Sequence, residues 1–559
     1  MKTKKNLPVL ALLMLAQAAH PAEIPSAGSQ LRQIPPLPAT TQPTPQLQVV
    51  PITAAPPAPA DDSRARITTL HVNAARLFTE AELIAAAGFT PGAELTLAQL
   101  QQMATRIADF YHARGYFLAR AYLPAQDITD GSVGITVVEA QYDKVDLRLS
   151  TKLSETLARR LLGEVKPGAT VASGSLKTAL LLLSDLPGVQ VSSTLMPGEA
   201  VGSSDLLVDI APGPRVTGSI DADNQGNRYT GRNHLGASIN INNPIGEGDQ
   251  INARVLTAGS GMHYGRAAYQ MQFGRTRAGV AYSSLGYALG AEFASLKAQG
   301  TARIASVFGS YPIIRSRNDN LYAQLNIESR AFRDEVDSTT TVTDKRARVM
   351  VASLSGDHRT GSSGDNGGGI SSYAATWTHG KLDLQSADAQ VADAATARTA
   401  GSYDKFGLSF THGQSLTDST FLYTTFTAQA AQRNLDISEK FQLGGANGVR
   451  AYPEGEAHGD QGYLMTLELR QTLPRLWDAQ PGLMQVLGFV DTGTVLANKT
   501  PWAPGENHRT LSGAGVGLNW GDERSFIAKA SLAHRIGNQK ATSAPDSATR
   551  FWLQVVKYF

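Results

Sequence analysis

The residue types that commonly carry catalysis or bind metals are scattered in this chain of 559 residues. The sequence has no cysteine, which excludes disulfides and cysteine-ligated zinc or iron–sulfur centres. Its 11 histidines form no H-E-x-x-H motif, and we find no G-x-S-x-G nucleophile elbow and no phosphate-binding loop. We therefore expect no enzymatic activity, no metal site and no other cofactor.

One arginine and one aspartate could instead form a structural ion pair. Arg450 lies in the glycine-containing segment LGGANGVRAY (443–452), and Asp491 lies in GFVDTG (488–493). A bidentate arginine–carboxylate contact in a confined site supplies geometry as well as free energy, so it could help to hold a long loop against its entropy. The residues alone leave open a second interpretation, in which Arg450 is a solvated charge and Asp491 pairs with another lysine or arginine.

The elements that must position these charges come after an export signal. Three lysines precede a short apolar stretch at 7–16, and small residues follow it. This is the layout of a secretory signal peptide, which we place at 1–22. The absence of cysteine suits a protein that passes through an oxidising compartment.

A proline-rich leader follows at 23–65 and is almost uncharged. Such a segment has few N–H donors and little apolar mass, so we expect an extended linker. Only 26–34 could form a short helix.

Two small α+β modules are predicted next, at 66–142 and 143–212. In the first, capping boxes at Thr79 and Thr96 each open a helix, and both modules show the order β-α-α-β-β. Exposed sheet edges in such modules suit the binding of an extended peptide by strand addition. The predicted strands are 67–72, 117–123, 132–139, 144–149, 189–195 and 204–210, and the predicted helices of the second module are 153–162 and 175–186.

From 213 to 559 the helical period gives way to alternating strands. Leu321, Ala323 and Leu325, for example, alternate with Tyr322, Gln324 and Asn326. An apolar face and a polar face on each strand of about ten residues are typical of a barrel with lipid outside and water inside. No run of about 18 apolar residues follows the first 20 positions, which excludes a bundle of membrane-spanning helices.

We count 16 such strands, and bacterial barrels of this kind have an even number. Sixteen strands would enclose an aqueous lumen. The chain ends in the strand FWLQVVKYF, and an aromatic last residue such as Phe559 is a usual assembly mark of outer-membrane barrels. The predicted strands begin near residues 215, 234, 249, 263, 277, 302, 320, 346, 369, 403, 419, 462, 484, 510, 526 and 550.

Several segments together resemble the two-partner secretion transporters (TpsB) of the Omp85 superfamily. RGYFLARAYLPAQDITDG (114–131) is similar to that family's first POTRA domain, and LLLSDLPGVQV (181–191) to its second. DNQGNRYTGRNHLG (223–236) is similar to the start of its barrel. The resemblance covers nearly the whole chain after residue 67, and it implies two POTRA modules followed by a 16-stranded antiparallel transmembrane β-barrel.

The same resemblance implies a role for the Arg450 segment. LGGANGVRAY is similar to the family's V-R-G-Y/F motif on a lumenal loop, here about 434–461, and GFVDTG to its G/F-x-D-x-G strand motif. In the family the loop arginine pairs with the strand aspartate, which implies an Arg450–Asp491 pair. Ala451 replaces the usual glycine, which adopts positive φ more readily than alanine. The other expected motif residues are Gly444, Gly445, Val449, Tyr452, Gly488, Phe489 and Gly493.

The implied function is secretion of one large, mostly β-helical exoprotein (TpsA) across a Gram-negative outer membrane, without ATP. The POTRA modules would receive this partner in the periplasm, and Arg114, Tyr116 and Gln126 are candidate contacts. Packing of Tyr116 inside its module and solvation of Arg114 are the structural alternatives. The barrel-assembly machinery and outer-membrane lipid are further expected partners. Nucleic acid is not expected, because the net charge is only +2.

Three other functions remain open. An outer-membrane protein assembly factor of the same superfamily usually carries three or five POTRA modules, whereas two are predicted here. A general porin would lack such modules. A surface adhesin or receptor would need long folded loops or a plug, whereas the segments 334–344 and 387–401 are short. Whether the leader plugs the barrel is likewise open.

Overall fold

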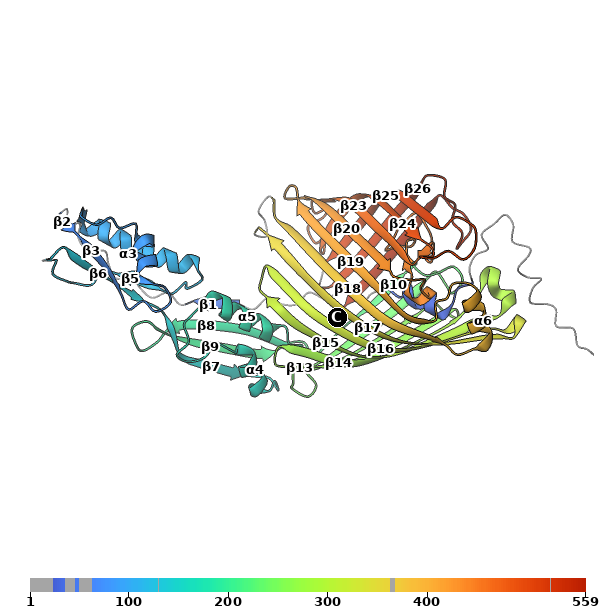
Figure 1. Ribbon diagram of the computed structural model, residues 1–559, viewed down its shortest axis with the longest axis horizontal. Helices are drawn as coiled ribbons and strands as arrows, with labels where there is room; N and C mark the ends of the chain where they lie inside the picture. Colours follow the sequence, from blue (N-terminus) through green and yellow to red (C-terminus); the bar gives the residue numbers. More distant parts are fainter. Residues whose placement is uncertain (1–23, 36–45, 50–62, 129, 362–366, 523) are drawn as a thin grey trace, which may run out of the picture.

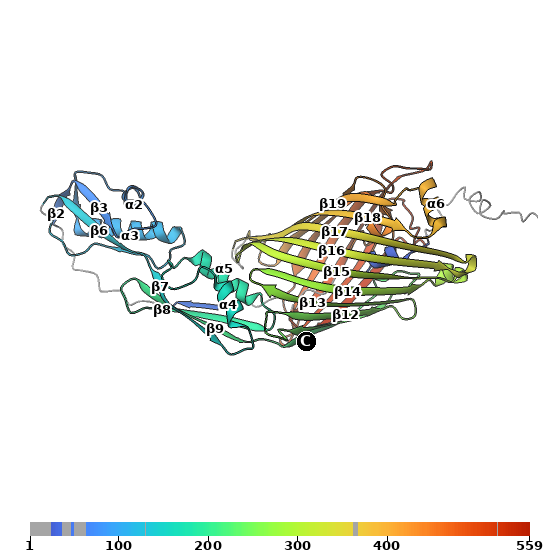
Figure 2. The ribbon, with the colours of Figure 1, turned by 60° about the horizontal axis from the view of Figure 1, so that its bottom comes forward.

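The computed structural model describes residues 24–35, 46–49, 63–128, 130–361, 367–522 and 524–559. The expected signal peptide lies outside these residues, as do two stretches of the leader. Two small modules follow one another beside one end of a large barrel (Figures 1 and 2). We call this end of the barrel the module-side end, and the opposite end the far end.

The first module has an apolar core between its helices and a three-stranded sheet. The helices α2 (Glu80–Ala87) and α3 (Leu97–Ala113) begin at capping boxes on Thr79 and Thr96, as predicted. Leu100, Ile107 and Tyr111 of α3 are buried against the sheet, in which β3 is parallel to β6 and β5 antiparallel to it. The strands are β2 (Arg64–Ile67), β3 (Thr69–Asn73), β4 (Ala93–Thr96), β5 (Arg120–Tyr122) and β6 (Ser132–Val138).

Three details of the first module differ from the prediction. The strand expected at 67–72 is two strands, because the N–H groups of Thr68 and Thr69 both donate to the carbonyl of Gly131. The strand expected at 117–123 is shorter, since Phe117 and Leu118 pack against the core of the second module. The strand β4 was not predicted, and it pairs with β2.

The second module has the predicted order and one additional strand. It comprises β7 (Gln141–Leu149), α4 (Glu155–Leu162), α5 (Ser173–Ser184), β8 (Val189–Pro197) and β9 (Ser203–Pro212). The leader contributes β1 (Gln46–Val49), which pairs in parallel with β8 at the edge of this sheet. The leader is extended at this position, as expected, but its pairing was not predicted; it forms because β8 offers unpaired backbone groups that the leader can satisfy.

Sixteen strands within the described residues close into an antiparallel barrel, in which β27 pairs with β10. Most strands begin within two residues of the predicted positions, and the largest difference is at β17, which begins at Thr341. The expected length of ten residues is too short for several strands, because ladders such as that of β16 and β17 continue to the far end. The strands are β10 (Val216–Asp223), β11 (His234–Asn242), β12 (Gln250–Thr257), β13 (Met262–Phe273), β14 (Thr276–Ala288), β15 (Ala298–Arg315), β16 (Asp319–Val336), β17 (Thr341–Thr360), β18 (Gly369–Leu384), β19 (Gly401–Ser415), β20 (Thr420–Ala431), β23 (Gln461–Thr472), β24 (Leu483–Leu496), β25 (His508–Asp522), β26 (Phe526–Ile536) and β27 (Thr549–Tyr558).

The barrel wall is apolar outside and polar inside, as the alternation predicts. On β11, Leu235 and Ile239 are exposed on the outer face, while Ser238 is buried on the inner face. Arg254 and Asp221 form a buried ion pair inside, with 2.9 Å between Nη1 and Oδ1. No helix among the described residues is long and apolar enough to cross a membrane.

The far end of the barrel carries short helices in its connections. Two 3₁₀ helices, η1 (Ala291–Leu296) and η2 (Asp337–Thr339), lie between neighbouring strands. The segment 387–401, expected to be a loop, contains α6 (Ala387–Ala395).

A polar joint fixes the second module to the barrel. Asp185, which ends α5, accepts two hydrogen bonds of 2.7 Å from the guanidinium of Arg315 on β15. Arg277 of β14 donates to the carbonyl of Asp185, and Thr178 donates to the carbonyl of Arg315. These contacts hold α5 against the module-side ends of two neighbouring strands.

Candidate functional site

The chain between β20 and β23 (432–460) folds into the barrel, and we call it the lumenal loop. It contains the short 3₁₀ helix η3 (Ile437–Glu439) and a hairpin of β21 (Phe441–Gln442) and β22 (His458–Gly459). The leader helix α1 (Ala27–Arg32) lies inside the barrel beside this loop (Figures 1 and 2). The loop and the helix together fill part of the lumen.

Arg450, near the tip of the loop, contacts Asp491 on the inner face of β24. Its Nε and Nη2 donate to the two carboxylate oxygens over 2.9 and 2.8 Å, and its backbone N–H also donates to Asp491. The Asp491 side chain is fully buried and accepts a further bond of 2.9 Å from Thr466 Oγ1. A bidentate contact with four donated hydrogen bonds satisfies the aspartate completely.

Two more side chains contact the guanidinium of Arg450, and we call its contacts with Asp491, Glu468 and Phe489 the seat of Arg450. Its third nitrogen, Nη1, donates to Glu468 on β23 over 2.8 Å, and its guanidinium lies 3.4 Å from the centre of the Phe489 ring. Glu468 is also bound by Arg470 over 2.6 Å. The indole of Trp552 on β27 donates to the Arg450 carbonyl over 2.7 Å. The loop tip is thus bonded to three separate strands.

Ala451, where the resemblance suggests glycine, fits this site without strain. It is not among the residues with positive φ, so alanine meets no steric cost there. Gly513 of β25 makes room for it, since a Cβ added at Gly513 would lie 2.6 Å from that of Ala451.

The motif glycines differ in what they contribute. Gly445 has φ +119°, and a Cβ there would lie 1.9 Å from a carboxylate oxygen of Glu454. Cβ atoms added at Gly444 and Gly493 would also lie too close to neighbouring atoms, at 2.5 and 2.7 Å. Gly488 has open space around it and therefore has no part in packing the loop. Val449 and Tyr452 are buried in the apolar cluster beneath the tip.

Glu454 is a partly buried acid beside the tip. Burial raises the pKa of its carboxyl to about 8, and the nearby charge of Asp223 acts in the same direction. Gln442 Nε2 donates to this carboxyl over 2.7 Å. The seated loop therefore favours the neutral acid.

The far side of the loop is held by the connection between β26 and β27. Glu456 accepts hydrogen bonds from the backbone N–H groups of Thr542 and Ser543 and an ion contact of 2.5 Å from Arg509. The Tyr452 hydroxyl donates to the carbonyl of Gln539 over 2.9 Å.

The base of the loop is held by a second set of charges. Asp460 is fully buried and binds Lys440 over 2.8 Å. Glu439 of η3 contacts both Arg330 of β16 and Lys405 of β19. Asp436 binds Lys345 of β17 over 2.7 Å.

The leader helix α1 is held by polar contacts with β16 and with the connection between β10 and β11. Its Ala27 N–H donates to Asp334 of β16 over 2.7 Å, and Thr230 donates to Gln30 over 2.8 Å. Gly28 packs on Ser438 of η3, where an added Cβ would lie 2.8 Å away. The helix predicted at 26–34 is therefore present, and the structure places it in the lumen.

The candidate partner contacts in the first module are engaged within that module. Arg114 lies 3.4 Å above the Phe110 ring, and Tyr116 packs edge-on against Phe78 and Tyr111. Gln126 exchanges two hydrogen bonds of 2.8 Å with the backbone of Gly134. The structure thus shows a packing role for Arg114 and Tyr116 and a hydrogen-bonding role for Gln126.

Phe559 continues the last strand past Tyr558. Its backbone exchanges two hydrogen bonds with Gly218 of β10, while its ring remains exposed.

Sequence reasoning missed Glu468, Trp552, Glu456 and Asp460. Glu468 could have been found, since it alternates with Thr466 on the inner face of β23, and those two residues stand opposite Phe489 and Asp491.

Comparisons with known proteins agree with this architecture. A model described as haemolysin secretion/activation protein ShlB/FhaC/HecB matches residues 202–520, and a ShlB-type POTRA domain matches 65–140. A relative from Haemophilus influenzae, the heme/hemopexin transporter protein HuxB, is 28% identical over 477 residues, covering 84% of this chain and 82% of its own length.

Two solved structures share the fold. CdiB from Escherichia coli has a TM-score of 0.72 at 19% identity and covers 91% of this chain and 93% of its own. BamA from Haemophilus ducreyi lacking POTRA domains 1–3 has a TM-score of 0.52 at 16% identity and covers 89% of this chain and 100% of its own. Because the family model spans more than half of the chain, the protein belongs to the ShlB/FhaC/HecB family of haemolysin secretion/activation proteins.

Proposed function

We propose that this protein is the outer-membrane translocator of a two-partner secretion system and moves an exoprotein through its own barrel. The modules lie at the periplasmic mouth, and the barrel has a polar lumen that a loop and a helix occupy. The observation that carries the proposal is the set of contacts around Arg450, in which the lumenal loop is held by ion contacts to Asp491 and Glu468.

Such contacts suit a gate. The lumen is lined by polar side chains, so water can replace each ion contact when the loop leaves its seat. An apolar seal of the same area would lose its stabilisation without any substitute. The loop and α1 would therefore move while the barrel wall keeps its strand pairing.

The exoprotein, which is the client of the translocator, would first bind the modules by strand addition. In the described residues, β5 of the first module lies at a sheet edge, and its Tyr122 is exposed. The corresponding edge of β8 in the second module is covered by β1 of the leader. An extended client could pair with β5 directly, whereas pairing with β8 would require displacement of β1.

Further parts of the proposal concern the cargo and the assembly of the barrel. The cargo would be a large, mostly β-helical exoprotein whose folding outside draws it through the barrel without ATP. The protein would be a transporter and not an enzyme. Phe559, exposed at the end of the closing strand, would be read by the barrel-assembly machinery.

The test is secretion of the exoprotein encoded beside this protein, in cells with wild type, Arg450→Ala or a deletion of 66–212. Barrel amounts are checked by heat-modifiable mobility. Loss of secretion at normal barrel levels supports a dedicated translocator. Unchanged secretion with impaired assembly of other barrels would instead indicate an assembly factor.

A further inference from the structure

Three arginines lie close together on the outer face of the barrel. They are Arg303 of β15 and Arg346 and Arg348 of β17, and all three are exposed. The residues between the last two, Ala347 and Val349, alternate with them and are buried on the inner face. Within the described residues, none of the three arginines makes an ion pair or a side-chain hydrogen bond.

These arginines lie at the far end of the apolar belt. On β15 the exposed apolar residues Val307 and Ile313 lie on the module side of Arg303, and on β17 Leu354 lies on the module side of Arg348. Trp377 of β18, exposed on the same face, marks the aromatic girdle near this level. An unpaired arginine is strongly destabilising at the bilayer midplane but costs little near the interface, which fits this position.

The positive charges are close together. Arg348 stands directly opposite Lys381 of β18 in the strand register. Arg303 and Arg346 stand on either side of Ala331 of β16, two strand spacings or about 10 Å apart. Arg346 stands opposite the acid Asp383 of β18, whereas Arg303 and Arg348 have no acid opposite them on either neighbouring strand. The like charges of Arg348 and Lys381 repel one another, and a bound anion would remove that repulsion.

The acids on the same face already have partners. Arg333 binds Glu335 over 2.6 Å and Asp344 over 3.0 Å. Lys381 lies 3.7 Å from Asp383. Arg303 and Arg348 therefore remain without an acid opposite them where the barrel wall meets the outer leaflet.

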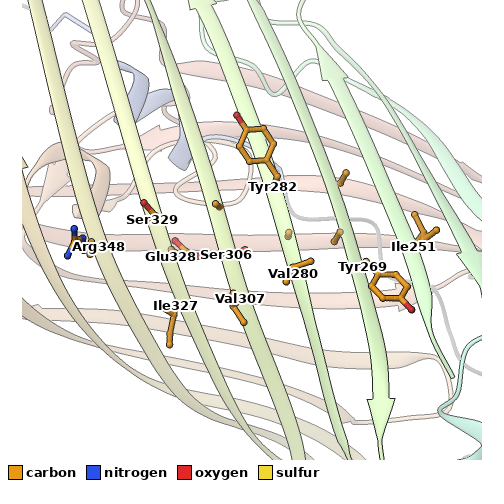
Figure 3. A pocket seen from close by; sticks show the side chains of 14 residues that line it. Ile251, Tyr269, Val280, Tyr282, Ser306, Val307, Ile327, Glu328, Ser329 and Arg348 are labelled. Carbon is orange, nitrogen blue, oxygen red and sulfur yellow. The ribbon is translucent and has the colours of Figure 1, made fainter. Parts of the chain in front are cut away.

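An apolar groove adjoins the arginines. It has a volume of about 920 Å³ and is lined by residues of β12 to β17, including Arg348. Figure 3 shows Tyr269, Val280, Val307 and Ile327 in a row across four strands, with Tyr282 further along β14. The alanines Ala267 and Ala305 between these larger side chains leave room for a chain of methylene groups.

We propose that this face binds the phosphorylated glycolipid of the outer leaflet, the lipid A part of lipopolysaccharide. Its phosphoryl groups bind Arg303, Arg346 and Arg348, and one acyl chain lies in the groove. Charge-assisted bonds from guanidinium to phosphate are among the strong hydrogen bonds, and they remove the repulsion within the cluster. The groove runs from the arginines towards the membrane interior, which is the direction that an acyl chain takes from its headgroup.

The test uses the purified full-length protein in detergent, titrated with lipid A and followed by native mass spectrometry. The variant Arg303→Gln/Arg346→Gln/Arg348→Gln should bind lipid A at least about tenfold more weakly than wild type. The matched control Arg317→Gln/Arg475→Gln/Arg524→Gln removes the same charge from exposed turns at the module-side end and should bind like wild type. Equal affinity of the two triple variants would overturn the proposal.

Two further arms separate the phosphoryl contacts from the groove. Ala305→Trp keeps every charge but fills the groove, and it should also weaken binding; unchanged binding would contradict the assigned groove. Dephosphorylated lipid A should bind weakly to wild type. If phosphatidylglycerol binds as tightly as lipid A, the assignment to the glycolipid is wrong. Heat-modifiable mobility confirms that each variant forms its barrel.

Discussion

The lumenal loop and the second module both bury apolar side chains, but only the loop tip is also held by buried ion contacts. The tip buries Arg450 against Asp491 and Glu468 beside Val449 and Tyr452, whereas the core of the second module consists of apolar side chains such as Leu176 and Leu183. Water can take over an ion contact in a wet lumen, but it cannot stabilise an exposed leucine. The ion contacts therefore suit a loop that leaves its position in the lumen, and the purely apolar core suits a module that keeps its shape.

The largest expected effect comes from removing Arg450. Arg450→Ala leaves Asp491 buried without its cation, which should destabilise the seated loop by about 3–5 kcal/mol. We expect a larger channel conductance in planar bilayers. Adding Asp491→Asn should recover part of the closed state, because position 491 then carries no unpaired buried charge and Glu468 keeps its contact with Arg470.

Arg470→Ala is the matched control for this change. Arg470 binds Glu468 but makes no contact with Asp491, so its loss should open the channel less. Equal conductance of wild type and Arg450→Ala would show that the tip contacts do not hold the loop, and the comparison would fail.

A somewhat smaller effect is expected in the apolar core of the second module. Leu176 is fully buried, and Leu176→Ala should destabilise this module by about 2–5 kcal/mol through lost contacts and a cavity. Faster hydrogen exchange should appear in α5 and β8, while the conductance of the barrel stays unchanged. A change in conductance would mean that the module and the loop are not independent.

A pH-dependent effect is expected at Glu454. Because burial raises its pKa from 4.5 to about 8, the seated loop is favoured at low pH and loses stability as the pH rises from 4.5 to about 8. Wild-type conductance should therefore increase with pH over this range. Glu454→Gln should abolish the increase; a variant that still responds like wild type would assign the response to another group.

The smallest effect is expected at an exposed pair in the second module. Lys144 and Glu199 are 2.8 Å apart, but both side chains are more than half exposed. Lys144→Gln should leave hydrogen exchange in β7 and β9 unchanged, because water screens such a pair. Faster exchange in these strands would show that the exposed ion pair, and not the apolar core alone, stabilises the module.

Local patterns predicted the elements whose physics is local. Capping boxes at Thr79 and Thr96 located two helix starts, and alternation located the barrel strands, because one face of each meets lipid. The resemblance, rather than any local pattern, brought Arg450 and Asp491 together.

The missed features depend on contacts between distant segments. The strand β1 forms only because β8 offers an open edge. The strand β4 pairs with β2 although β3 and α2 lie between them in the sequence. The partners Glu456 and Asp460 become visible only when the loop is folded into the lumen, where Thr542, Ser543 and Lys440 reach them. No local spacing in the sequence predicts contacts between residues that are so far apart in the chain.

The leader joins the two regions compared here. Its helix α1 lies in the lumen and its strand β1 lies on β8, so a single stretch of chain is anchored at both places. Anchoring α1 keeps β1 at a high effective concentration next to β8. A client strand that pairs with β8 must therefore displace β1 while β1 is tethered close by. Release of α1 from the lumen would lower the effective concentration of β1, although the contacts between β1 and β8 would be the same.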